Sequence, residues 1–122
     1  MEQFTDEQIC KILSLATRRK VLILTVKDRT AVGLKDSITD YIHRHGMGNV
    51  LQRFQPKRGR IFFKGAFETV MVMSVDWWNS HAGCDLYVFD GLVYITNRCI
   101  TDIKHIKEEP RPITEIWDNH SD

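Results

Sequence analysis

No stretch of this 122-residue chain approaches the roughly 18 apolar residues of a membrane-spanning helix, so the sequence predicts no transmembrane segment. The N-terminus opens on acidic residues and lacks the basic and apolar regions of a signal peptide. The three cysteines are an odd number and do not suggest a disulfide framework. We therefore expect a cytoplasmic protein whose thiols are reduced.

A strong overall charge is also missing, because the formal net charge is only +1. Binding to nucleic acid would therefore need a local cluster of cations. Both ends of the chain are acidic, and the excess of Lys and Arg lies in the middle. A hydrophobic content of 43% with 27% charged residues argues against wholesale disorder. We expect a single α+β domain over residues 1–109 and an acidic C-terminal tail over residues 110–122, anchored by Trp117.

Motifs that would fix an enzymatic activity are absent from the sequence. It contains no Gly-x-Ser-x-Gly elbow, no phosphate-cradling glycine loop and no pair of carboxylates beside a strand end. An acid–base mechanism would have to use His81 with Asp76, Asp85 or His105 as its partner. Because nothing selects a nucleophile, we assign no catalytic residue and expect a binding protein rather than an enzyme.

Metal ligation is not indicated either. His43 and His45 form an H-x-H pair, and His81 lies close to Cys84 in the sequence. On a helix, however, residues two apart point about 200° away from each other, so the H-x-H pair would not converge. Cys84 and Cys99 would be diagonal neighbours in a hairpin and are interpreted as small buried side chains. We expect no metal and no cofactor.

The clearest local pattern is a helix over residues 5–18. Thr5 and Gln8 form a capping box, and Phe4 and Ile9 occupy the staple positions around it. The apolar residues that follow keep the spacing of one buried helical face. A second, short helix is expected over residues 37–46, with Ser37 as its cap.

The strand predictions rest on apolar runs and turn residues. Residues 20–27 and 68–78 are apolar on both faces, and residues 28–35 are interpreted as a strand that returns after a turn near Asp28. Asp90 and Gly91 lie between two β-rich runs and predict a type I′ hairpin of residues 85–89 and 92–96.

These elements predict an α+β fold with an N-terminal helix, a short inserted helix and a mostly antiparallel sheet of five to six strands. The sheet is either a small half-closed β-barrel or an open sheet that meets a second copy with its spare apolar face. The run DGLVYITNRCITDIKHI, residues 90–106, resembles the last strands of small SH3-like or Sm-like barrels. Both arrangements favour a homo-oligomer.

The most distinctive segment is QRFQPKRGRIFFKG, residues 52–65, which contains five cations, no acid and three phenylalanines. Cations that follow phosphates and rings that stack on bases are typical of proteins that bind single-stranded nucleic acid. The candidate phosphate-binding cations are Arg53, Lys57, Arg58, Arg60 and Lys64, and Phe62 is the candidate ring among them. Trp77 or Trp78 would supply a further stacking ring, because adjacent residues of a strand point to opposite sides.

Three functional hypotheses follow. The first is a small cytoplasmic, oligomeric protein that binds nucleic acid or a nucleotide ligand through this basic segment. The alternative is a protein–protein interaction or inhibitor protein that dimerises through an apolar sheet face and meets an acidic protein partner. The third is a small hydrolase or nuclease that depends on His81. None of the three involves a membrane.

Overall fold

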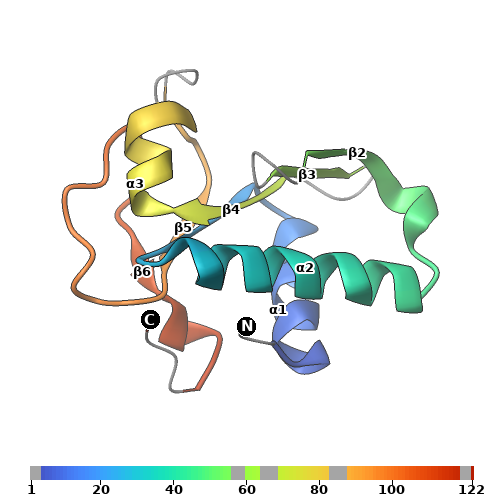
Figure 1. Cartoon of the computed structure of the whole chain (residues 1–122). Coiled ribbons are helices and arrows are strands. Elements are labelled where there is room, and N and C mark those ends of the chain that lie inside the picture. The colour runs from blue at the N-terminus through green and yellow to red at the C-terminus, as the bar shows by residue number, and fades with distance from the viewer. Residues whose placement is uncertain (1–3, 56–59, 64–68, 83–87, 119–121) are drawn as a thin grey trace.

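The structure is a computed structural model that describes residues 4–55, 60–63, 69–82, 88–118 and 122. The elements are α1 (Asp6–Ala16), β1 (Val21–Thr25), α2 (Asp28–Arg44), η1 (Gly48–Val50), β2 (Leu51–Gln55), β3 (Arg60–Phe63), β4 (Val70–Ser74), α3 (Val75–Trp77), η3 (Trp78–Ala82), β5 (Leu92–Ile95), β6 (Arg111–Pro112) and η4 (Ile113–Glu115) (Figure 1). Among the described residues, no helix is long and apolar enough to cross a membrane.

The strands form one open sheet in the order β2-β3-β4-β1-β5-β6. Four neighbouring strands, β4, β1, β5 and β6, are parallel, whereas β3 is antiparallel to both β2 and β4. The prediction of a mostly antiparallel sheet or a half-closed β-barrel is therefore wrong, and the architecture is α/β. The barrel-like pairing suggested by residues 90–106 is wrong for the same reason, because β5 pairs with β1 in parallel.

Both faces of the central strand β1 are covered within the chain. Alternate residues of β1 belong to two separate cores, since Val21 and Ile23 pack with α1 and α2, whereas Leu22 and Leu24 pack with Trp78. Figure 1 shows α1 and α2 on one side of the strands and α3 on the other. The apolar residues on both faces of β1 and β4 are thus buried without a second copy of the chain. Their burial no longer supports a homo-oligomer, which stays a prediction.

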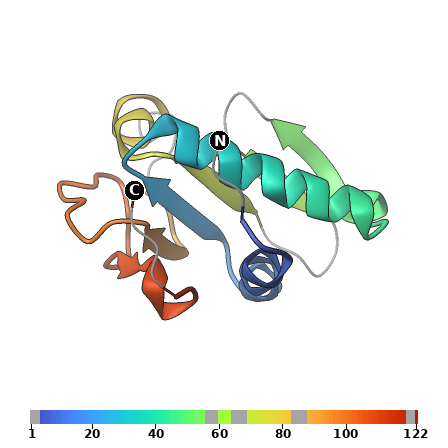
Figure 2. The same cartoon turned by 60° about the horizontal axis from the view of Figure 1, so that its bottom comes forward.

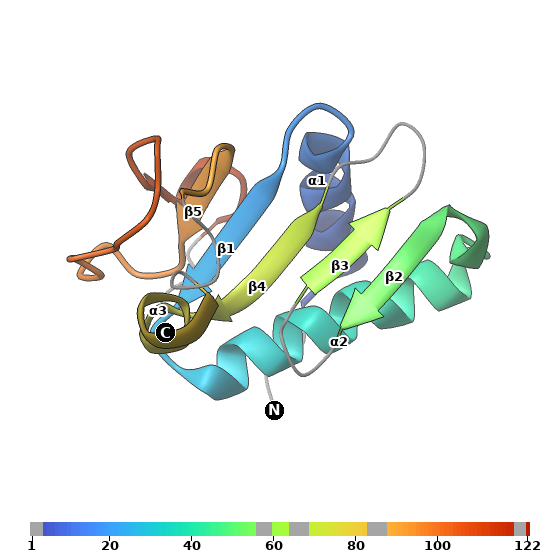
Figure 3. The same cartoon turned by 90° about the horizontal axis from the view of Figure 1, so that it is seen from above.

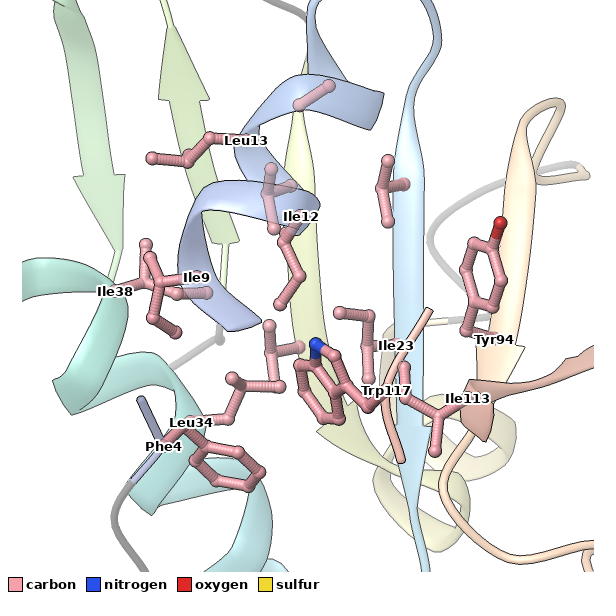
Figure 4. Close-up of a cluster of buried hydrophobic side chains, with 14 of the residues drawn as sticks. Phe4, Ile9, Ile12, Leu13, Ile23, Leu34, Ile38, Tyr94, Ile113 and Trp117 are labelled. Atoms are coloured by element: carbon pink, nitrogen blue, oxygen red, sulfur yellow. The ribbon is translucent and has the colours of Figure 1, made fainter. Parts of the chain in front are cut away.

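Helix α1 begins as the sequence predicts. The hydroxyl of Thr5 accepts a hydrogen bond from the Gln8 N–H at 3.2 Å, and the Gln8 side chain accepts one from the Thr5 N–H at 2.9 Å. Ile9, Ile12 and Leu13 are buried beneath the helix (Figure 4). The capping box and the apolar spacing are both local, which is why this prediction is confirmed.

Helix α2 replaces two predicted elements. The predicted strand over residues 28–35 is wrong, and the short helix over residues 37–46 is only the second half of α2. Ser37 does not cap a helix; its hydroxyl accepts a hydrogen bond from the Phe4 N–H at 3.3 Å. The first half of α2 contains Val32 and Gly33, which are poor helix formers, but Leu34 and its buried neighbours pack against the sheet and override that preference.

The predicted long strand over residues 68–78 ends early. Strand β4 stops at Ser74, whose hydroxyl caps the following turn by accepting from the Trp77 N–H at 3.2 Å. The chain then continues through α3 into the π-helical stretch η3. Trp77 and Trp78 are therefore on a helix and not on a strand, so they are not directed to opposite sides of the sheet.

The predicted hairpin around Asp90 and Gly91 is also wrong, because its second strand pairs with β1 and β6; residues 85–87 of its first strand lie outside the described residues. Strand β5 pairs with β1 from Leu92 onwards, and Phe89 forms an isolated parallel bridge with Ile106. Gly91 is needed for close packing, since a Cβ there would lie 2.5 Å from the carbonyl oxygen of Lys20. The Asp-Gly pair thus marks a close approach of two chain segments, not a tight turn between paired strands.

The C-terminal segment contributes to the core beside α1. Ile113 and Trp117 are buried, and the Trp117 ring lies 5.1 Å from the Phe4 ring, measured between centroids (Figure 4). The Trp117 indole N–H donates to the carbonyl oxygen of Gln8 at 3.3 Å. Trp117 therefore anchors this segment, as the sequence indicates.

Tyr94 gives this core an expected dependence on alkaline pH. Burial raises the pKa of its phenol above the ordinary value of 10.0, and Arg111 and Arg19 oppose that effect only in part. A phenol with a raised pKa in the folded state stabilises the fold below pH 10, and this contribution is lost as the pH rises further. We expect wild type to lose more stability than Tyr94→Phe between pH 8 and 11, measured by urea unfolding. Equal losses would contradict this role.

Candidate functional site

The basic segment forms a two-stranded hairpin at one edge of the sheet. Strands β2 and β3 pair antiparallel, with Arg53 opposite Phe62 and Gln55 opposite Arg60. Opposite residues of an antiparallel pair share a face, so the positions of Arg53, Arg60 and Phe62 belong to one face of the hairpin. Of the remaining predicted phosphate-binding residues, Lys57, Arg58 and Lys64 lie outside the described residues.

The register also says which side of the whole sheet this face belongs to. Arg60 is opposite Met71 of β4, and Met71 belongs to the core on the α3 side. Figure 3 views the sheet from that side, and no helix among the described elements lies over β2 and β3 there. Helix α2 lies behind the hairpin in the same view. Within the described part of the chain, no helix therefore covers the face with Arg53, Arg60 and Phe62.

The two tryptophans have different surroundings. Trp78 is 0% exposed, and its indole N–H donates to the carbonyl oxygen of Lys104 at 2.6 Å. Trp77 is 38% exposed and stacks on the imidazole of His81, with 4.0 Å between ring centroids. Of these two candidate stacking rings, only Trp77 presents surface to a ligand, and the stacking role itself stays a prediction.

The histidines and cysteines do not assemble a reactive centre in the part of the chain that the structure describes. No group of three or more His, Cys, Asp or Glu residues there could hold a metal ion. His45 stacks on Tyr41, with 4.1 Å between ring centroids, and Cys99 is exposed as a free thiol. Cys84 and Asp85 lie outside the described residues.

A second candidate site lies at the carboxyl ends of β1 and β5. Strand β1 is followed by α2, and the chain then continues to the strands on the β4 side of the sheet. Strand β5, which pairs with the other edge of β1, is followed by a connection to β6, on the opposite side. The two connections leave these strand ends in opposite directions, which makes the place between them a topological switch point. In open α/β sheets, ligands bind in the crevice outside such strand ends.

The carboxylate of Asp122 lies at these strand ends, between the turn that follows β1 and the end of β5, and we call this place the crevice. One of its oxygens accepts hydrogen bonds from the backbone N–H groups of Val26 and Lys27, at 2.9 Å and 3.0 Å. The other accepts from the hydroxyl of Thr96 at 2.5 Å, and the Asn97 side chain donates to the Asp122 backbone carbonyl at 2.8 Å. Figures 2 and 3 both show the C mark beside the arrowhead of β1. The strand ends thus hold a negative group that comes from the same chain.

One polar atom near this crevice is left without a partner. Thr30, in the first turn of α2, is 0% exposed, and its hydroxyl makes no hydrogen bond among the described residues. The Cα–Cβ bond of a helical residue tilts towards the helix N-terminus, so the Thr30 side chain leans towards the turn between β1 and α2. A buried hydroxyl without a partner costs about 1–3 kcal/mol, so its presence asks for an explanation.

The sequence patterns do not identify Thr30, Thr96 and Asp122 as residues of a site. All three depend on the parallel order of β1 and β5, which was not predicted. A usable signal was present: the run VLIL is apolar throughout, as is typical of a buried parallel strand, and a short turn and a helix follow β1. Recognising that strand–helix unit would have directed attention to the turn at Val26 and Lys27.

A shallow groove lies on the outer side of α1. It has a volume of about 750 Å³ and is lined by Glu7, Cys10, Lys11, Ser14, Leu15, Thr17, Arg18 and Ile116. Its lining is largely apolar and brings together no catalytic set. It is a surface that another protein could contact.

No protein-family model, no curated protein and no solved structure shows a significant match to this chain.

Proposed function

We propose that this protein binds nucleic acid, or a nucleotide ligand, across the hairpin of β2 and β3. The observation that carries the proposal is the register that assigns Arg53, Arg60 and Phe62 to one face of the hairpin, over which none of the described helices lies. Cations on such a face would follow the phosphates, and rings would stack on the bases. Lys57, Arg58 and Lys64 belong to the same basic segment and would add to the charge.

The position of Trp77 supports binding on the same side of the sheet. Trp77 is the last residue of α3, on the side of the sheet to which the hairpin face with Arg53, Arg60 and Phe62 belongs. Its exposed indole is preorganised by the stack on His81. A base that stacks on an aromatic side chain is stabilised by about 1–3 kcal/mol. The proposal includes a cytoplasmic location, which the free thiols of Cys10 and Cys99 support.

We expect the double variant Arg53→Glu/Arg60→Glu to bind a fluorescently labelled oligothymidylate more weakly than wild type at low salt, with the difference shrinking at high salt. Each phosphate contact contributes about 0.7 to the slope of log affinity against log salt for a single strand, so losing two would flatten that slope by about 1.4. Fluorescence anisotropy over a salt series measures both quantities. A labelled ATP analogue in a parallel series distinguishes a nucleotide from a nucleic acid.

The matched control for this experiment is Lys11→Glu, a charge reversal on α1. Lys11 is exposed and makes only a 3.8 Å ion pair with Glu7, so its reversal changes the net charge with little effect on the fold. Lys11→Glu changes the net charge by half as much as the double variant, so a loss of binding free energy half as large as that of the hairpin variant would mean that the binding is unspecific. Unchanged affinity in the hairpin variant would refute the proposed function.

The alternative is a protein-interaction role, which the groove beside α1 favours. It predicts that the purified protein carries a stoichiometric protein partner and no absorbance excess at 260 nm. The sequence suggested an apolar sheet face as the interface, but both faces of β1 are covered within the chain. The groove beside α1 is therefore the interface that this alternative would use.

A further inference from the structure

We propose that the crevice between the carboxyl ends of β1 and β5 is a phosphate-binding site in which the Asp122 carboxylate takes the place of a phosphate group. The ligand class is a phosphate monoester or free phosphate, such as the terminal phosphate of a nucleotide. This site is separate from the hairpin of β2 and β3 and does not depend on the function proposed for it.

The crevice offers more donors than the Asp122 carboxylate contacts. The two oxygens of Asp122 are satisfied by Val26, Lys27 and Thr96, yet the hydroxyl of Thr30 remains buried without a partner. The N–H groups of Asp28 and Arg29, in the first turn of α2, have no acceptor within the helix. A phosphate group has more oxygens than a carboxylate and can accept from the turn, the first helical turn and the hydroxyls together. The unpartnered Thr30 hydroxyl is explained by a ligand larger than the group now present.

The electrostatics also favour an anion with more charge than a carboxylate. The 17-residue helix α2 directs the positive end of its dipole at the crevice, and the side chain of its N-cap residue, Lys27, makes no capping hydrogen bond. Three exposed cations lie in the segments that form the crevice: Lys27 and Arg29 at the start of α2, and Arg98 in the loop after β5. Asp28, also at the start of α2, is an acid. When a ligand displaces the Asp122 carboxylate, these three cations face only the one negative charge of Asp28. The remaining positive charge suits a doubly charged phosphate.

Asp122 then acts as a competitor within the molecule. A tethered carboxylate is present at a high effective concentration, so it lowers the apparent affinity for any phosphate that must displace it. It also satisfies the N–H groups of Val26 and Lys27 when no ligand is bound. The crevice is thus kept closed to weak anions and is opened by a ligand that binds more of the available donors.

We expect Asp122→Ala to bind inorganic phosphate at least about tenfold more tightly than wild type, because the internal competitor is removed. Isothermal titration calorimetry gives the affinity, and amide chemical shifts of Val26, Lys27 and Thr96 show where phosphate binds. Added phosphate should raise the melting temperature of Asp122→Ala more than that of wild type. Parallel titrations with ATP and with a 5′-phosphorylated oligonucleotide separate free phosphate, a nucleotide and a nucleic-acid end as the source.

Two further variants make the test decisive. Asp118→Ala removes an exposed acid from the same segment and should leave phosphate affinity at the wild-type level. Thr30→Val in the Asp122→Ala background keeps the side-chain shape and removes an unsatisfied hydroxyl, so the protein should stay folded while phosphate affinity falls about tenfold. The proposal is overturned if Asp122→Ala binds no better than Asp118→Ala, if Thr30→Val has no effect, or if the shifts appear only in the hairpin.

Discussion

Replacing Trp78 by Ala is expected to lower the free energy of unfolding by about 3–5 kcal/mol, the usual cost of removing a large buried aromatic side chain. The indole is fully buried in the core on the α3 side, where it contacts the Phe89 ring edge-on, with 6.1 Å between centroids. Its N–H also satisfies the carbonyl oxygen of Lys104, in the loop that follows β5. Removing the ring leaves both a cavity and a buried carbonyl without its donor. Urea unfolding monitored by circular dichroism measures the change.

The neighbouring Trp77 provides the matched control for this prediction. Trp77→Ala removes the same side chain one residue earlier, but from a position that is 38% exposed. Its effect on stability should be well below that of Trp78→Ala, because less buried surface is lost. Similar losses in the two variants would show that Trp78 does not occupy the core in the way described.

Gly91→Ala is expected to destabilise the fold by about 1–3 kcal/mol, the usual range for overpacking. The added Cβ would lie 2.5 Å from the Lys20 carbonyl oxygen and 2.8 Å from the Phe89 ring. That carbonyl accepts a hydrogen bond from the Leu92 N–H at 2.9 Å, where β5 begins to pair with β1. Because the nearest atom belongs to the backbone, the clash cannot be relieved by a side-chain rotation alone. Thermal and urea unfolding measure the loss.

Gly48→Ala is the control for this substitution. A Cβ at Gly48 would meet nothing within 4 Å, and the residue does not need a left-handed backbone. Its substitution should be neutral or stabilising by up to about 1 kcal/mol, through the lower entropy of the unfolded chain. A Gly91→Ala variant as stable as Gly48→Ala would contradict the close approach of Gly91 to Lys20.

Local patterns predicted the elements that local interactions determine. The cap at Thr5 and Gln8 and the buried face of α1 were readable because all the partners lie within one or two helical turns. The burial of β1 and β4 was readable because both runs are apolar throughout. In each case the sequence neighbours of a residue are also its structural neighbours.

Strand order and direction were not readable, because they depend on partners far apart in the chain. Val21 pairs with Val70 on one side and with Leu92 on the other, and no local pattern states either pairing. The Asp90-Gly91 signal favours a hairpin when taken alone, but β5 gains more by pairing with the buried strand β1. The helical state of residues 28–35 likewise depends on packing against the sheet, which overrides weak local propensity.

The same distinction applies to the two candidate sites. The cations and rings of the hairpin are contiguous in the sequence, so they could be proposed from composition alone. The crevice joins the turn after β1, the end of β5 and Asp122, which are brought together only by the parallel sheet. A site assembled from three distant segments becomes visible only when the strand order is known.

The central position of β1 has a consequence during synthesis on the ribosome. Residues 21–25 emerge before both of their partner strands, which lie at residues 70–74 and 92–95. Until those residues have been translated, an uncharged segment of strong β-formers has no native neighbour on either edge. Such a segment is prone to pair with other nascent chains. Slow translation would prolong this exposure and so increase the risk that the nascent chain aggregates through β1.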